Sequence, residues 1–185
     1  QNDIILIFDE CTSGFREQFG GLHKKYKVDP DMMMLGKTLG NGYAITAVLG
    51  KREFMLSAED TFISSTFWTE RIGPTAALKT LEVMKREKSW EIITSLGNYM
   101  QEKWKSISEK YNVDINITGL PSVSSFSFNH DDSQLYKTFL TQEFLKKGFL
   151  ATTSFYASTA HTIEVIDNYS VVMEEIFLKI KKCID

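Results

Sequence analysis

Two side chains able to do covalent and acid–base chemistry follow two apolar runs of the chain. Asp9 closes the run at residues 4–8, and Lys37 follows the run at residues 32–35. The first run has no alternation of apolar and polar residues, which is typical of a strand buried on both faces of a parallel sheet. Ligands of open parallel sheets bind at the carboxyl ends of the strands, so we expect both side chains at one edge.

A carboxylate and a primary amine at such an edge match the needs of pyridoxal phosphate. The aldehyde of this cofactor bonds to a lysine amine, and its ring nitrogen must keep a proton, which a neighbouring carboxylate favours. Asp9 and Lys37 are therefore the candidate catalytic and cofactor-binding residues.

Three other interpretations of these residues stay open. In an ATPase, Gly36-Lys37-Thr38 would end a phosphate loop, but that loop needs a glycine where the chain has Asp31. Alternatively, Asp9 caps a turn and Lys37 is a solvated loop residue. A metal site is the third interpretation, and the three widely separated histidines lack ligand spacing, so we expect no metal.

Composition narrows the class of partner. The net charge is -3 and no basic stripe runs along the chain, so we expect no nucleic-acid partner. No apolar run approaches the about 20 residues that span a bilayer, so we expect no membrane partner. Cys11 and Cys183 show no disulfide or metal spacing, which favours a reducing, cytoplasmic location.

Apolar periodicity divides the chain near Lys88, with strands and loops before it and a smaller α+β part after it. The 3.6-residue period predicts helices at about residues 70–88, 90–111, 135–147 and 172–184. Strands are predicted at 113–117 and 123–128, and the second alternates apolar residues with serine, which fits an antiparallel sheet with one solvent-exposed face. A short strand is predicted at 149–153 and a loop at 154–162. The predicted fold class is α/β.

Two long segments closely resemble class III aminotransferases. They read ILIFDECTSGFREQFGG and PDMMMLGKTLGNGYAITAVLGKREFM, and the likeness continues through SSTFWTERIGPTAALKTL. The resemblance is close over residues 4–88 and is strongest to glutamate-1-semialdehyde aminomutase and its aminotransferase relatives. It implies fold type I, with residues 1–88 forming part of the cofactor-binding large domain and its mainly parallel sheet. Residues 89–185 would form the small C-terminal α+β domain.

The same resemblance implies roles for five residues. Asp9 matches the acid that pairs with the pyridine nitrogen, and Lys37 matches the lysine that bonds to the cofactor. Thr66 matches a threonine that binds the cofactor phosphate across the interface of a homodimer. Cys11 falls where an apolar residue packs against the ring, and Thr12 falls where many members carry a glutamine near the ring hydroxyl.

The implied activity is transfer of an amino group between a small amine or amino acid and a carbonyl compound. Transfer within one molecule, as in an aminomutase, stays open, and so does a non-catalytic binding domain on the same scaffold. The family's N-terminal half supplies the phosphate cup and a ring-stacking aromatic residue, and these 185 residues carry no counterpart of it. We therefore expect the C-terminal portion of an enzyme, inactive or nearly so by itself.

Overall fold

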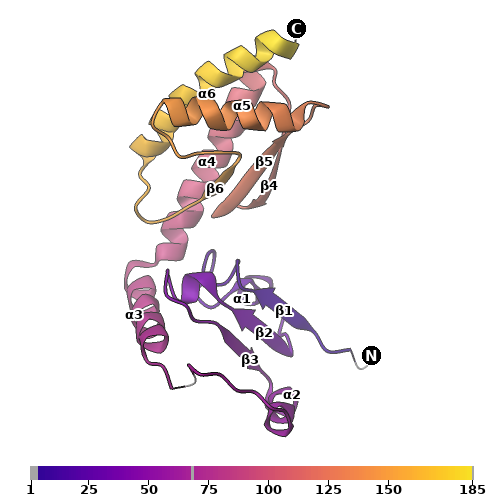
Figure 1. Cartoon of the computed structure of the whole chain (residues 1–185), viewed down its shortest axis with the longest axis vertical. Helices are drawn as coiled ribbons and strands as arrows, with labels where there is room; N and C mark the ends of the chain where they lie inside the picture. The colour runs from indigo at the N-terminus through magenta and orange to yellow at the C-terminus, as the bar shows by residue number, and fades with distance from the viewer. Residues whose placement is uncertain (1–3, 68, 185) are drawn as a thin grey trace. The chain divides into compact units, whose positions relative to one another are not determined.

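The computed structural model describes residues 4–67 and 69–184 (Figure 1). The chain forms two compact units, Gln1–Glu91 and Ile92–Asp185, which are named unit 1 and unit 2 below. The division falls in the first turn of helix α4 (Ser89–Tyr111), close to the boundary that the sequence predicts after Lys88.

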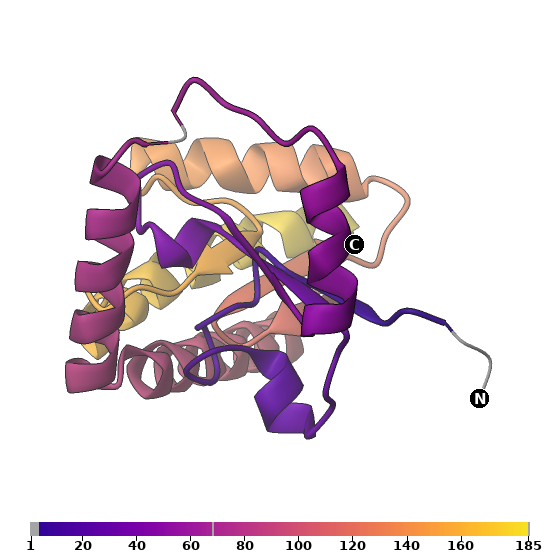
Figure 2. The same ribbon diagram turned by 90° about the horizontal axis from the view of Figure 1, so that it is seen from below.

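Unit 1 is built on a three-stranded sheet in the order β1-β2-β3. Its strands are β1 (Ile7–Glu10), β2 (Met32–Leu35) and β3 (Ala47–Gly50). β1 and β2 are parallel, and β3 runs antiparallel to β2. The remaining elements are α1 (Leu22–Tyr26), η1 (Lys37–Leu39), α2 (Arg52–Met55), η2 (Leu56–Asp60) and α3 (Ile72–Glu87). Helix α3 lies beside the short turn η1, as Figure 2 shows.

The apolar run at residues 4–7, which leads into β1, is exposed, and this corrects the prediction of a strand buried on both faces. Ile4 is 78% exposed, and Ile5, Leu6 and Ile7 are also exposed. β1 lies at the edge of the sheet and pairs only with β2 among the described strands. Only Ile7 and Phe8 of the run belong to β1, which has the expected parallel neighbour, and the described residues leave the side chains of residues 4–7 exposed.

Unit 2 packs three long helices with an antiparallel sheet in the order β4-β5-β6. After α4 come β4 (Ile115–Leu120), β5 (Val123–Phe128), α5 (Ser133–Lys146), β6 (Ser154–Tyr156) and α6 (Ile163–Ile184). α5 and α6 run side by side (Figure 1). The predicted strand at 149–153 is wrong, because the third strand forms within the segment expected to be a loop.

Close backbone approach shapes the packing of α4 in unit 2. A Cβ atom on Gly97 would lie only 1.9 Å from the carbonyl oxygen of Pro121, in the turn between β4 and β5. Glycine at this position lets the helix approach that turn. Across residues 4–67 and 69–184, no helix is long and apolar enough to cross a membrane.

Candidate active site

The parallel pairing of β1 and β2 determines where Asp9 and Lys37 lie. Asp9 pairs with Met34 and Glu10 with Leu35 in the register of the two strands. Lys37 comes two residues after Leu35, so the acid and the amine both lie at the carboxyl ends of their strands. Side chains alternate between the faces of a strand, so Asp9 and Glu10 point to opposite faces.

The Asp9 carboxylate is held in its charged form. The backbone N–H of Cys11 donates a hydrogen bond of 3.0 Å to its Oδ1 atom. That bond lowers the pKa of Asp9, and contacts with the Cys11 side chain and the positive charge of Lys37 lower it further. Burial raises the pKa of the Cys11 thiol, and the hydrogen bond with Asp9 raises it too. An ionised acid thus lies beside a protonated thiol.

Lys37 is held by its side chain and by an unusual backbone conformation. Its Nζ atom donates a hydrogen bond to the Thr12 hydroxyl. Its φ angle is +38°, in the left-handed region that non-glycine residues seldom adopt. The N–H groups of Gly40 and Asn41 donate to the Lys37 carbonyl at 3.2 and 3.0 Å, which stabilises the turn. Such strain tends to occur where function requires a fixed geometry.

The structure therefore brings four of the five predicted site residues together. Asp9 contacts Cys11, Lys37 contacts Thr12, and the charge of Lys37 acts on both Asp9 and Cys11. Thr66 lies in an exposed segment between η2 and α3. Within the described part of the chain, no hydrogen bond or ion pair joins Thr66 to the other four, and its role stays a prediction.

Glu10 is a structural residue of this region that the sequence analysis missed. It is only 2% exposed, and it accepts hydrogen bonds from the backbone N–H groups of Leu22 (2.6 Å) and His23 (3.1 Å). Its Oε1 atom also lies 2.9 Å from Nδ1 of His23. Burial alone would raise the pKa of Glu10, but the hydrogen bonds from His23 and Leu22 hold it below its usual value.

The loop from Cys11 to Leu22 is thus tied to the end of β1 by a buried carboxylate. Gly21 allows this contact, because a Cβ atom there would lie 2.4 Å from Oε2 of Glu10. The signal in the sequence was the pair Gly20-Gly21, which interrupts an otherwise polar and aromatic stretch. Nothing in the local pattern showed which side chain that glycine would face.

A cavity of about 520 Å³ borders the turn after Lys37. It lies between residues 40–43 and the first half of α3, and Arg71 and Lys79 are its basic lining residues. The cluster of Asp9, Cys11 and Thr12 does not line it. Among the residues that the structure describes, no three His, Cys, Asp or Glu side chains gather where they could hold a metal ion.

Comparison with known proteins identifies the family. Residues 1–183 match the family model of the class III aminotransferases. The chain belongs to this family. The resemblance noted from the two motifs is thereby confirmed, and the match extends over the C-terminal part where the sequence likeness was only general.

Two curated relatives of this class III chain carry different activities in their names. The chain is 38% identical over 77% of its length to the 3-aminobutyryl-CoA aminotransferase of Cloacimonas acidaminovorans. It is 29% identical over 96% of its length to the glutamate-1-semialdehyde 2,1-aminomutase of Methanocaldococcus jannaschii. The chain spans 34% and 45% of these relatives, which is less than half of either.

Solved structures establish the fold of this class III chain. The FumI protein of Sphingopyxis sp. MTA144, in its PLP-containing form, superposes with a TM-score of 0.86 at 22% identity. The match covers 95% of this chain and 43% of that protein. The predicted α/β fold of the fold type I transaminases is confirmed.

Proposed function

We propose that the protein carrying this chain is a pyridoxal-phosphate-dependent aminotransferase, which moves an amino group between an amine or amino acid and a carbonyl compound. The observation that carries the proposal is the joint position of Asp9 and Lys37 at the ends of two parallel strands in a class III chain.

The chemistry of the donor set fits pyridoxal phosphate. When bound, this group supplies an aldehyde that bonds reversibly to amines and a ring that accepts electrons. Lys37 offers the amine for that aldehyde. Asp9 offers a negative charge for the protonated ring nitrogen, and the low pKa of Asp9 keeps that charge in place at neutral pH. Cys11 and Thr12, which contact Asp9 and Lys37 respectively, would be the next residues to hold the ring.

The residues of the chain divide the proton transfers between them. With the cofactor bound, Asp9 would keep the ring nitrogen protonated, because a carboxylate beside it favours the charged form. With the cofactor bound, the Lys37 amine would take up the proton from the substrate carbon that bears the amino group and would later give a proton back. Thr12 orients Lys37 by accepting its hydrogen bond.

The remaining parts of the proposal rest on the family likeness. Thr66 would bind the cofactor phosphate across the interface of a homodimer, and its exposed position leaves it available to a second chain. Residues 1–88 would be the C-terminal part of the large domain and residues 89–185 the small domain. The free state of Cys11 and Cys183 favours a cytoplasmic protein.

A second candidate function is intramolecular transfer. It is favoured by the glutamate-1-semialdehyde 2,1-aminomutase of Methanothermobacter thermautotrophicus, which is 29% identical over 98% of the chain. An aminomutase converts one substrate to its isomer without a separate acceptor. An aminotransferase stops after one half-reaction unless a carbonyl compound is added. Turnover with and without an added 2-oxo acid therefore separates the two.

The test is covalent labelling of Lys37. Pyridoxal phosphate is added to the protein extended to the full length of its relatives, the link is reduced with borohydride, and peptide mass spectrometry locates the label. We expect the label on Lys37, a visible absorption band before reduction, and amino transfer. Lys37→Ala should lose all three, whereas Lys105→Ala, on the exposed face of α4, should keep them.

The 185-residue chain, tested in the same way, should show weak labelling and little or no transfer, because it spans less than half of its relatives. Label on another lysine, or transfer retained in Lys37→Ala, would contradict the proposed function. Tight cofactor binding and transfer by the 185 residues alone would contradict only the proposal that this portion is inactive.

A further inference from the structure

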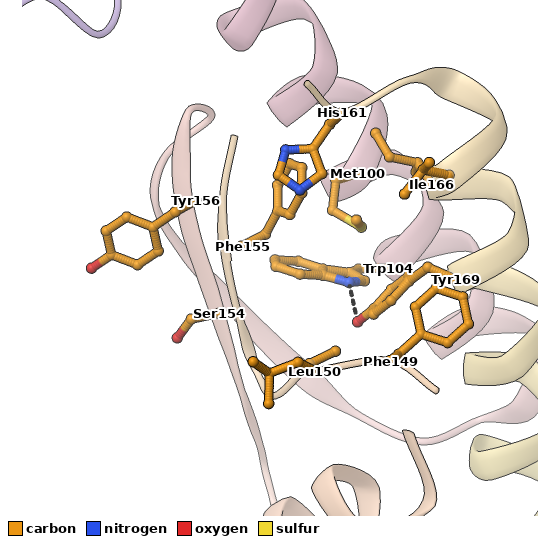
Figure 3. Close-up of a pocket in the computed structure, with 12 residues that line it drawn as sticks. Met100, Trp104, Phe149, Leu150, Ser154, Phe155, Tyr156, His161, Ile166 and Tyr169 are labelled. Atoms are coloured by element: carbon orange, nitrogen blue, oxygen red, sulfur yellow. Dashed lines mark hydrogen bonds between the residues drawn. The ribbon is translucent and has the colours of Figure 1, made fainter. Parts of the chain in front are cut away.

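Unit 2 contains a cavity of about 310 Å³ that has no part in the cluster of Asp9 and Lys37. All of its lining residues belong to unit 2 (Figure 3). Its walls are mainly apolar and aromatic and come from α4, β6, α6 and the segment after α5, including Met100, Trp104, Phe149, Phe155 and Ile166. Small-molecule sites of proteins have this character, with a few polar groups in an apolar wall.

Packing holds the aromatic walls in place. The ring of Tyr169 stacks on Phe144, with centroids 4.5 Å apart and planes 10° from parallel, and the edge of Phe149 meets the same ring. Trp104 packs edge-on against Phe126. Rings fixed in this way do not have to reorganise when a ligand binds, which favours binding.

The Tyr169 hydroxyl is a hydrogen-bond donor at the cavity for which the described residues provide no acceptor. The indole N–H of Trp104 donates to the Tyr169 oxygen at 3.1 Å, as the dashed line in Figure 3 shows. An indole N–H can only donate, so the Tyr169 oxygen is the acceptor and its own proton needs another partner. Among the described residues no acceptor for that proton is found, although Tyr169 is only 7% exposed. Burial raises the pKa of Tyr169, so the hydroxyl stays a donor.

A second donor lies at another end of the cavity. The backbone N–H of Ser158 donates to Nδ1 of His161 at 3.0 Å, so in the neutral imidazole the proton is on Nε2. His161 lies beside Phe155, with ring centroids 5.0 Å apart, and Figure 3 shows both at the end of the cavity away from Leu150. Tyr169 and His161 therefore each offer a donor to the cavity, and no carboxylate, lysine or arginine lines it within the described part of the chain.

We propose that this cavity binds a small, neutral, flat aromatic molecule with a hydrogen-bond acceptor, which the Tyr169 hydroxyl recognises. An apolar cavity of about 150 Å³ takes up benzene, so about 310 Å³ suits a ring with a substituent. The acceptor must be neutral, because a buried carboxylate without a cation is strongly disfavoured. Leu150 lines the cavity and is 99% exposed, so the cavity reaches the protein surface at this residue.

The test uses the 185-residue chain and three probes of similar size. Benzamide carries a neutral carbonyl acceptor, toluene carries none, and benzoate carries a charged one. The indole N–H signal of Trp104 reports binding in a proton–nitrogen NMR spectrum, and that of Trp90, which does not line the cavity, is the internal control. We expect benzamide to shift the Trp104 signal in a saturable way, with toluene and benzoate each binding at least about fivefold more weakly.

Three variants decide between this site and non-specific binding. Tyr169→Phe keeps the ring and removes the donor, so benzamide should bind about fivefold more weakly. Tyr136→Phe removes a buried hydroxyl elsewhere in unit 2 and should leave binding unchanged. Ala151→Leu places a larger side chain in the cavity wall and should abolish the shift.

The proposal is overturned if the Trp104 signal does not move at any soluble concentration of benzamide. It is equally overturned if the shift persists in Ala151→Leu, or if toluene binds as tightly as benzamide, because the Tyr169 donor would then recognise nothing. Tyr169→Phe also removes the acceptor of the Trp104 indole, so folding of each variant is checked from its full spectrum. None of these readouts depends on aminotransferase activity.

Discussion

The two units of this chain differ in how they are held together. Within the described residues, the core of unit 2 contains nineteen buried apolar side chains, and that of unit 1 contains five. Unit 1 leaves apolar residues exposed, including residues 4–7 at and before the start of β1 and Phe62, which is 97% exposed. Unit 2 buries large side chains on all three of its long helices.

The candidate active-site residues lie in unit 1, which has the smaller core. Hydrogen bonds rather than packing hold them: Glu10 ties the loop after β1, Cys11 orients Asp9, and the turn at Lys37 is closed by backbone bonds. Regions with few buried contacts open more readily than packed cores. Amide hydrogen exchange should therefore be faster in unit 1, and the variants below test where stability and geometry reside.

The largest expected effect is the loss of a core ring from unit 2. Phe177 is fully buried on α6 and contacts the rings of Phe126 and Phe128. Phe177→Ala leaves a cavity and should reduce the free energy of unfolding of unit 2 by about 3–5 kcal/mol. Urea unfolding followed by the amide signals of unit 2 measures this loss.

The matched control removes a ring from unit 1 that has no core around it. Phe62→Ala should change the free energy of unfolding by less than about 0.5 kcal/mol, as at other exposed positions. Equal losses of unfolding free energy in Phe177→Ala and Phe62→Ala would show that the core of unit 2 is no more tightly packed than the surface of unit 1.

The second effect is the loss of the buried carboxylate in unit 1. Glu10→Ala leaves the N–H groups of Leu22 and His23 without their acceptor. Buried donors without partners cost about 1–3 kcal/mol, so unit 1 should lose that much stability while unit 2 is unchanged. Exchange rates of the Leu22 and His23 amides provide the measurement, and Glu53→Ala, at an exposed position on α2, is the control. If those two amides stay protected in Glu10→Ala, Glu10 does not anchor this loop.

The third effect tests strain at the candidate catalytic lysine. Lys37 has φ +38°, so Lys37→Gly should be more stable than Lys37→Ala by about 1 kcal/mol. Lys79, in the middle of α3, provides the opposite case, because there glycine should be less stable than alanine by about 1 kcal/mol. The melting temperatures of the four variants give the order of stability of glycine and alanine at each position. The same order at both positions would mean that Lys37 is not held in a left-handed conformation.

The long helices of this chain were predictable because each has its own apolar period. α3 and α4 occur where the spacing of Ala77 and Trp104 with their neighbours placed them, whereas α6 begins at Ile163 and not at residue 172, where its predicted apolar period starts. The short strand β6 was not predictable, because only Phe155 of its three residues is buried and the others are exposed. Its pairing with β5 depends on contacts far along the chain.

The candidate site was predictable only in part, for a similar reason. Strand ends are visible in the sequence, so Asp9 and Lys37 could be placed at one edge of the sheet. The burial of Glu10 depends on a loop that returns to it twelve residues later, at Leu22, and no local pattern encodes that return. The exposure of β1 was equally hidden, since an apolar run has the same sequence whether or not something covers it.

The smallest expected effect concerns an ion-pair cluster on the surface of unit 2. Glu143 on α5 contacts Lys146 and Lys179, and these hydrogen bonds lower its pKa to about 2. The folded state thus favours the charged carboxylate more than the unfolded state does. Its contribution is therefore complete above the ordinary pKa of a glutamate and is lost as the pH falls from about 4.5 towards 2.

Glu143→Gln should accordingly flatten the pH dependence of unit 2 stability over that range and leave unit 1 unaffected. The size of the effect should stay within about 1 kcal/mol, because ion pairs near solvent are screened. Urea unfolding at a series of pH values, with high salt as a second condition, measures it. An unchanged pH profile in Glu143→Gln would mean that the link between α5 and α6 depends on packing alone, as the rest of the unit 2 core does.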